Sequence, residues 1–313
     1  MRRAGVSLVA VMAQNLQEFL MFAMCSPPFV RARILARVAL AGLVIASLSA
    51  FQARAETGPL VAGADVGNAP YIIAKPDGTY DGFDVERLAE IARRIGRPGY
   101  QLVDQQWSGI FAGLNARRFE FIMASTVITR ERAESVLFTE GDHENDYRFL
   151  ILKSSAPITK LEDLRGKVIA VNQGNTYDKW VTDRAEQYGW KVERYAKNED
   201  AVQAVLAKRA YANLASTGAT AWTASKNPRL VGSLVIESGQ NKGMVFRKDD
   251  AALRNQIEEA LECMKLDGTM ARLQAKWLGV EAGPNSAARQ VKPGYGEPGM
   301  PGYDPTEHTP KCS

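Results

Sequence analysis

Polar side chains gather at three places where an apolar run of the sequence ends. These places are segments 65–68, 124–132 and 172–177. In open α/β sheets, ligands bind at the carboxyl ends of strands, next to helix N-termini whose free N–H groups attract anions. Arg132 lies in the first turn of an expected helix, where a positive charge is unfavourable for the helix dipole. A cation is tolerated there when it faces a bound anion, so Arg132 is a candidate anion-binding residue. The alternative is an exposed arginine paired with Glu131 or Glu134.

The sequence does not carry a pattern that supports catalysis or metal binding. Ser125 has no histidine nearby in the sequence to activate it as a nucleophile. His143 is expected to be a surface or hinge residue rather than a catalytic base. Two histidines and three cysteines are too few for a Cys/His metal scaffold, and segment 173–176 lacks the Gly-Lys-Ser/Thr ending of a P-loop. We therefore expect no catalytic residue, no metal and no cofactor.

The composition is that of a folded chain of about two domains. It has 313 residues, of which 46% are hydrophobic and 24% charged, and a formal net charge of +4. That charge is unevenly distributed, because the first 55 residues hold six of the 39 basic residues and one of the 35 acidic ones. The remaining 258 residues carry 33 basic and 34 acidic side chains. This balance excludes the basic surface that nucleic-acid binding requires.

Residues 1–55 have the features of a secretory signal peptide. A basic segment, RARILAR, precedes about fourteen apolar residues and an A-x-A site, with cleavage expected after Ala55. A membrane anchor is the alternative, but a spanning helix needs about 20 apolar residues. Met24 would give a signal peptide of ordinary length, so the true start of the chain is open. We expect the protein to be exported in soluble form.

Short apolar runs alternate with helical patterns from residue 60 to 279, which predicts an α/β fold. Strands are expected at 59–65, 101–107, 119–125, 148–153, 167–172, 212–216, 234–238 and 243–248. Helices are expected at 84–95, 110–118, 129–135, 159–166, after 176, at 198–209, and twice between 249 and 279.

Two helix starts and the C-terminal segment carry further expectations. Asp84 and Thr129 are of the residue types that cap helix N-termini. Beyond Gly283 the chain is rich in Gly and Pro, and this tail, with an unknown role, is expected to be disordered or extended. Cys263 and Cys312 either form one disulfide that ties down the tail or remain free thiols.

Five stretches follow one another in an order that is typical of a known family. They read DGFDVERLAEIARRIG, WSGIFAGL, FEFIMASTVITRERAESVLFTE, LEDLRGKVIAVNQGNT and LDGTMARLQAKWLG. Together they resemble the periplasmic solute-binding proteins of polar-amino-acid ABC transporters (bacterial extracellular solute-binding protein family 3), over about residues 58–280. Each motif alone is weak, whereas the series is specific.

The resemblance implies a two-lobed periplasmic binding protein fold, in which two open α/β sheets are joined by a two-segment hinge with the ligand in the cleft. The first lobe would comprise 57–145 plus 243–282, and the second lobe 146–242. Residues 283–313 would form the Pro/Gly-rich tail.

The resemblance also implies which residues contact the ligand. Arg132 would pair bidentately with a ligand carboxylate. The other implied ligand-binding residues of the first lobe are Asp65, Asn68, Trp107, Ala124, Ser125 and Val127. Those of the second lobe are Asn172, Asn175, Thr176, Tyr177 and Ser216. Trp107 would lie against the ligand, and Asp65 would hold the far end of a polar side chain.

Two departures from the family pattern affect the expected ligand. Ser216 stands in YANLAST where relatives often have an aspartate that binds an α-ammonium group, and serine does not neutralise a charge. Asn68 stands where relatives often have an aromatic residue. A carboxylate with a polar body, such as an amino-acid derivative, is therefore expected; the alternative is a shifted alignment with a carboxylate supplied from elsewhere in the chain.

The function that the resemblance implies is capture of an amino acid or amino-acid-like carboxylate in the periplasm. The protein would act as a monomer and deliver its ligand to an inner-membrane ABC permease, and it would not be an enzyme. Two alternatives remain. One is an enzyme on the same fold resembling cyclohexadienyl dehydratase, and the other is a protein that presents its ligand to a membrane sensor.

Overall fold

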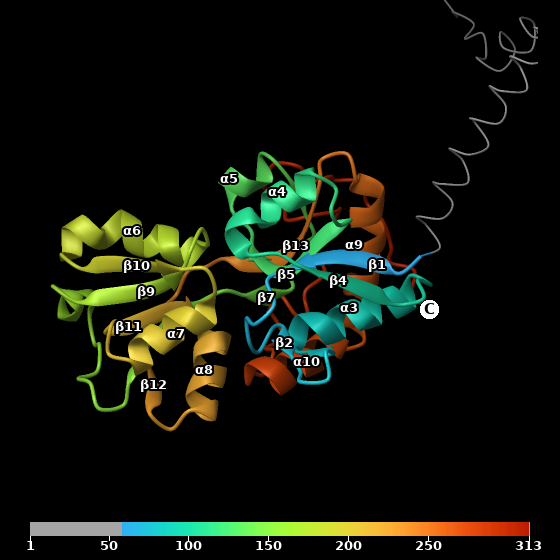
Figure 1. Cartoon of the computed structure of the whole chain (residues 1–313). Helices are drawn as coiled ribbons and strands as arrows, with labels where there is room; N and C mark the ends of the chain where they lie inside the picture. The colour runs from blue at the N-terminus through green and yellow to red at the C-terminus, as the bar shows by residue number, and fades with distance from the viewer. Residues whose placement is uncertain (1–57, 313) are drawn as a thin grey trace, which may run out of the picture. The chain divides into compact units, whose positions relative to one another are not determined.

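The computed structural model describes residues 58–312 (Figure 1). The expected signal peptide, its cleavage after Ala55 and the alternative start at Met24 lie outside these residues. Within them, every helix is too short or too polar to span a lipid bilayer.

The first of two main sheets is a mixed sheet in the order β4-β1-β5-β13-β6, and β7 pairs with β13. Its strands are β1 (Leu60–Ala64), β4 (Tyr100–Asp104), β5 (Phe121–Val127), β6 (Leu137–Phe138), β7 (His143–Glu144) and β13 (Asn241–Phe246). β1 runs parallel to β4 and β5, whereas β13 is antiparallel to β5. The apolar runs of β1 and β5 are almost entirely buried because helices cover both faces.

The helices of this lobe are α3 (Phe83–Arg94), α4 (Ile110–Asn115), α5 (Arg130–Ala133), α9 (Ala251–Leu266) and α10 (Thr269–Leu278). α3, α9 and α10 pack against one another, and α4 packs against β1 and β5. A small hairpin, β2 (Ile73–Ala74) and β3 (Tyr80–Asp81), precedes α3. The expected Thr129 cap is confirmed, since its side chain accepts a hydrogen bond from Arg132 N. The expected Asp84 cap is wrong, because Gly82 takes that position and Asp84 is buried.

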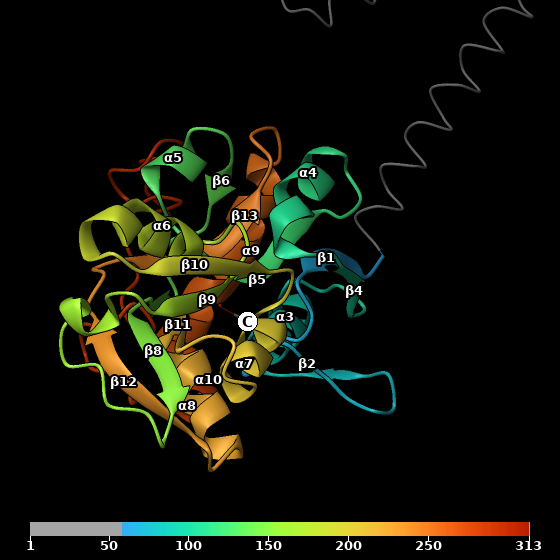
Figure 2. The same cartoon turned by 60° about the vertical axis from the view of Figure 1, so that its left-hand side comes forward.

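The second sheet has the order β10-β9-β11-β8-β12. Its elements are β8 (Tyr147–Leu152), a 3₁₀ turn at Leu161–Leu164, β9 (Val168–Asn172), α6 (Thr176–Tyr188), β10 (Lys191–Tyr195), α7 (Asn198–Leu206), β11 (Ala212–Ser216), α8 (Thr217–Lys226) and β12 (Leu230–Ile236). α6 lies on one side of the sheet and α7 and α8 on the other (Figures 1 and 2). Successive β8 side chains enter opposite clusters, Phe149 and Ile151 on one face and Leu150 and Leu152 on the other.

The chain thus has the two-lobed α/β fold. One lobe holds the first sheet and the other holds the second, and the chain crosses between them at 139–146 and at 237–240. The lobe limits expected above remain a prediction; β13 of the first sheet begins at Asn241, two residues before the expected limit at 243. Strand β10 and helix α8 were not expected from the sequence.

A buried ionic cluster holds the first lobe to the first of these connections. The guanidinium of Arg87 on α3 is fully buried and pairs with Asp84 at 2.8 Å and with Asp142 in the connection. It also donates a hydrogen bond to the Met123 carbonyl of β5. Asp142 in turn contacts the ring of His143. This residue is buried and belongs to β7, in the first connection between the lobes.

The Pro/Gly-rich tail packs against the molecule instead of being disordered. It has irregular backbone with one bridge between Tyr295 and Asp304, and Ala288 is fully buried. The Cys263–Cys312 disulfide forms and ties the tail to α9. Lys265 of α9 joins the pieces, because its buried ammonium donates hydrogen bonds both to the tail and to the hinge. Its acceptors are Gln290 O, Gly141 O and Glu140 Oε1.

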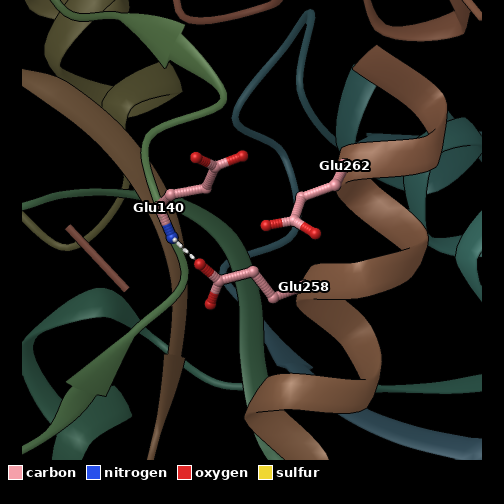
Figure 3. Close-up of side chains that lie close together, drawn as sticks. All are labelled: Glu140, Glu258 and Glu262. Carbon is pink, nitrogen blue, oxygen red and sulfur yellow. Dashed lines mark hydrogen bonds between the residues drawn. The ribbon is translucent and has the colours of Figure 1, made fainter. Parts of the chain in front are cut away.

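Three buried carboxylates lie beneath the tail, with ligand atoms within 4.8 Å of one another. Figure 3 shows Glu258 and Glu262 on one helix facing Glu140 on the opposite segment. Glu258 accepts hydrogen bonds from the N–H groups of Glu140 and Gly296, and Glu262 contacts His308 of the tail at 2.8 Å. Burial raises the pKa of Glu258 to about 8 and that of Glu262 to about 7. Gly296 and His308 of the tail are partners of these carboxylates, so the cluster holds the tail against α9.

Removing the disulfide should destabilise the protein. We expect the pair Cys263→Ala and Cys312→Ser to lower the free energy of unfolding by about 2–4 kcal/mol, because the bridge closes a long loop that restricts the unfolded chain. The sequence separation of 49 residues sets that loop. Urea unfolding followed by circular dichroism measures the change. A reductant should lower the stability of the parent protein equally and leave the variant unaffected; equal stability of the two proteins would contradict the prediction.

The stability of the protein should fall as pH rises through the range in which Glu258 ionises. Its folded pKa of about 8 exceeds the ordinary 4.5, so its contribution is complete below about 4.5 and is lost as pH approaches 8. Glu258→Gln should flatten this slope and stabilise the protein at pH 8 by on the order of 1 kcal/mol or more. Urea unfolding at pH 5 and pH 8 measures it. The exposed Glu281→Gln is the control, and an unchanged slope in Glu258→Gln would overturn the assignment.

Candidate functional site

A cavity of about 50 Å³ is lined by residues of both lobes. One water molecule needs about 10–15 Å³ on the same measure, so the cavity has room for a small solute. The carboxyl ends of β1, β9 and β11 supply Asp65, Asn172 and Ser216, and β5 supplies Ser125 and Val127. The site therefore lies at the edge where open α/β sheets bind ligands.

Eleven of the twelve residues expected to bind ligand line this cavity. They are Asp65, Asn68, Trp107, Ser125, Val127, Arg132, Asn172, Asn175, Thr176, Tyr177 and Ser216. Their roles in binding remain predictions. Ala124 is not among the lining residues, because side chains alternate along β5 and those of Ser125 and Val127 occupy the cavity side.

Four further residues line the cavity that the sequence analysis did not find, namely Asn198, Ala215, Ala219 and Lys242. Ala219 belongs to α8, a helix that was not expected. Lys242 precedes the apolar run 243–246, and a lysine in that position is typical of an exposed strand end. The strand in fact begins at Asn241, so it includes Lys242, and that residue is only 3% exposed. The residues next to Lys242 in the sequence do not indicate that its side chain is buried.

Arg132 presents a cation that the chain does not neutralise. Within residues 58–312, no carboxylate lies within 4.0 Å of its guanidinium, so the alternative of a pair with Glu131 or Glu134 is not observed. Its Nη1 donates to the Val127 carbonyl at 3.0 Å, and the guanidinium lies 5.6 Å from the centre of the Trp107 ring. Burial lowers the pKa of Arg132 to about 10, which leaves it charged at neutral pH.

Trp107 connects the two lobes beside this cation. It stands at the start of a 3₁₀ turn, Trp107–Gly109, and is 9% exposed. Its indole N–H donates a hydrogen bond to the Gly174 carbonyl of the second lobe at 3.2 Å. Trp107 therefore forms a wall of the cavity and supports Arg132 by cation–π contact.

The N-terminus of α6 faces the cavity from the second lobe. Asn175 caps the helix by accepting a hydrogen bond from Asp178 N, and both Asn175 and Thr176 line the cavity. The buried hydroxyl of Thr176 has no hydrogen-bond partner in the described part of the chain. Free N–H groups and an unpaired hydroxyl at a helix N-terminus favour an anionic ligand group.

Asp65 is the carboxylate of the cavity lining, and its buried Oδ1 has no hydrogen-bond partner in the described part of the chain. Lys197 of the second lobe lies 3.8 Å from Asp65 and donates a hydrogen bond to the Val66 carbonyl at 2.7 Å. Burial raises the pKa of Asp65 to about 6, against the opposing effect of Lys197. The pair also bridges the lobes.

Ser216 lies in a network of hydroxyl groups. Its Oγ caps α8 by accepting a hydrogen bond from Ala219 N, and it lies 3.1 Å from the Tyr71 hydroxyl. Lys242 Nζ donates to the same Tyr71 hydroxyl at 3.2 Å.

The lining residues suit binding rather than metal coordination. The cavity is lined by one carboxylate and by no histidine or cysteine among the residues described. Metal sites need several such ligands. What the cavity offers is an excess of hydrogen-bond donors and positive charge.

The chain matches the family of bacterial extracellular solute-binding proteins, family 3, over residues 60–280. It is 26% identical to the L-arginine-binding protein of Pseudomonas aeruginosa, over 77% of this chain and 96% of that protein. It is 30% identical to the lysine/arginine/ornithine-binding periplasmic protein of Escherichia coli, over 78% of this chain and 96% of that protein.

Solved structures agree with these relatives. An ancestral arginine-binding protein bound to arginine superimposes with a TM-score of 0.67 and 27% identity, covering 71% of this chain and 99% of its own. An ancestral amino acid-binding protein, described as a precursor of cyclohexadienyl dehydratase, gives 0.64 and 27%, covering 74% and 99%. The protein therefore belongs to family 3 of the bacterial extracellular solute-binding proteins.

Proposed function

We propose that this protein captures a small carboxylate solute in the periplasm and delivers it, as a monomer, to an ABC importer of the inner membrane. Family membership and relatives named for amino-acid binding support this role. The observation that carries the proposal is the uncompensated guanidinium of Arg132 in a cavity shared by two lobes. A carboxylate would pair with it bidentately, and the α6 N-terminus would add donors from the other side.

Binding would proceed with the lobes closing on the solute. Contacts that cross between the lobes at the cavity include Trp107 to Gly174, Lys197 to Asp65 and Tyr71 to Ser216. Because these contacts lie around the cavity, they and a bound solute would stabilise the same closed arrangement of the two lobes. No covalent step is needed for this cycle.

An enzyme is the second candidate function, because one structural neighbour is described as a precursor of cyclohexadienyl dehydratase. Elimination from a prephenate-like acid needs a positioned acid. Asp65, whose pKa is raised to about 6 by burial, lines the cavity. Incubation with prephenate tests this function, and the absence of product formation would exclude it.

Arg132→Ala should abolish the binding of carboxylate solutes. Truncating one partner of a buried charge pair costs about 2–5 kcal/mol, so affinity should fall by at least about 30-fold. A thermal-shift panel of amino acids and organic acids, on protein refolded to remove bound solute, measures the loss. Arg130→Ala is the control, because Arg130 lies on the same helix but donates to the Gly299 carbonyl away from the cavity. Retained shifts in Arg132→Ala would contradict the proposed role.

Lys197→Met should shift the ligand-free protein toward open conformations. The change removes the ion pairs with Asp104 at 3.4 Å and Asp65 at 3.8 Å and the hydrogen bond to the Val66 carbonyl, all of which cross between the lobes. We expect a larger radius of gyration by small-angle X-ray scattering and an affinity lowered by a few fold. Lys191→Met, in an exposed position of the same lobe, is the matched control. Identical scattering curves for the parent and Lys197→Met would show that these contacts do not hold the lobes together.

A further inference from the structure

Lys242 is a buried cation in the cavity with no carboxylate partner of its own. Its side chain reaches the cavity from β13, between the two lobes, and 3% of the residue is exposed. Within residues 58–312, no carboxylate oxygen lies within 4.0 Å of its ammonium group. Its ammonium donates a hydrogen bond to the neutral hydroxyl of Tyr71, whose ring centre lies 4.5 Å away, and it also interacts with the Tyr177 hydroxyl.

The acidic groups nearest to Lys242 are engaged elsewhere. Asp84 pairs with Arg87 at 2.8 Å and accepts two hydrogen bonds from Ser125, one of them from the backbone N–H. Asp142 is held by Arg87 and His143. These carboxylates therefore lack the freedom to neutralise Lys242 at contact distance.

Lys242 nevertheless remains charged. Burial opposes its charge, whereas the hydrogen bond to Tyr71 and the carboxylate of Asp84 favour it; the phenols of Tyr177 and Tyr71 add to this only where they are ionised, and the pKa of Lys242 is raised. The Tyr177 side chain also interacts with Arg132, so one ring stands within the electrostatic reach of both cations.

The position of this charge is incompatible with a free α-ammonium group at Ser216. The Tyr71 hydroxyl lies 3.1 Å from Ser216 Oγ and 3.2 Å from Lys242 Nζ. An ammonium bound at Ser216 would thus meet a hydroxyl and a like charge close behind it, and like charges in a buried site repel strongly. An acidic group in the same place would gain a charge-assisted hydrogen bond from Lys242.

We propose that the solute is a small dianion, such as a dicarboxylate, without a free α-ammonium group. Its first carboxylate pairs with Arg132, and its second acidic group is held by Lys242 with the Ser216 hydroxyl. The charges of the lining support this, since two cations without a carboxylate partner, Arg132 and Lys242, outnumber its one carboxylate, Asp65. The inference rests on the proposed function only in requiring that this cavity binds the solute.

Calorimetry with matched probes tests the charge requirement. The refolded full chain would be titrated with succinate, glutarate and 2-oxoglutarate, with butyrate as the monocarboxylate of matched length, and with L-arginine, L-histidine and L-glutamate. We expect at least one dicarboxylate to bind about tenfold or more tightly than butyrate, and the amino acids to bind weakly. Lys242→Met should remove that preference, so that no dicarboxylate binds more tightly than butyrate to this variant. Lys191→Met should change neither affinity.

A second pair of variants keeps the test independent of the folding of Lys242→Met. Ser216→Asp places a carboxylate beside Lys242, so it should abolish dicarboxylate binding without removing the lysine. Combining Ser216→Asp with Lys242→Met should leave that carboxylate free and create measurable binding of free amino acids. Thermal melting of each variant verifies its fold.

The outcomes separate this inference from the proposed function. Tight binding of a standard amino acid that is lost in Arg132→Ala would support the proposed function and overturn the dianion. Dicarboxylate binding unchanged by Lys242→Met and by Ser216→Asp would also overturn it. Binding of neither class, with Arg132→Ala indistinguishable from the parent, would overturn both.

Discussion

The pairing of Arg87 with two buried carboxylates is the interaction on which the rest of this structure depends. Arg87, Asp84 and Asp142 are all fully buried, so each charge is tolerable only while the others are in place. Asp84 fixes Ser125 in the wall of the cavity, and Asp142 fixes His143 in the hinge. One ion cluster therefore sets the first helix, the central strand β5 and the first connection between the lobes in a single register.

The cavity divides its chemistry between the parts that meet there. The first lobe supplies the guanidinium of Arg132, and strand β13 supplies the ammonium of Lys242. The second lobe supplies uncharged donors at the start of α6. Its one carboxylate, Asp65 at the end of β1, lies 3.8 Å from Lys197 of the second lobe. Two cations against one carboxylate give such a lining a net positive charge, which favours an anionic solute.

Much of the fold could be predicted from the sequence, because continuous apolar runs identify buried strands such as β5 and β9. Strand β10 escaped prediction because KVERY lies at a sheet edge and is half exposed, so it lacks an apolar run. Helix α8 escaped because TGATAWTASK is rich in residues of weak helix propensity, and its start depends on the Ser216 cap.

The site was predicted by resemblance more than by local chemistry. Eleven of its residues were named in this way, but Lys242 and the bridge from Lys197 to Asp65 were not. Both depend on contacts between segments far apart in the sequence, which short patterns do not report. Asp84 shows the same limit: its residue type favours a helix cap, yet a buried arginine one turn later draws it into the core.

The two connections between the lobes differ in stiffness. Segment 139–145 is mostly buried and is braced by the tail, whose residues donate to Glu140 and Glu144. Segment 237–240 is half exposed, has no such brace, and contains Gly239 with a φ of 64°. Because Ser238 and Gln240 of the second connection are hydrogen-bonded to Asp146 and Asn145, backbone changes in one connection would be coupled to the other as the lobes rotate.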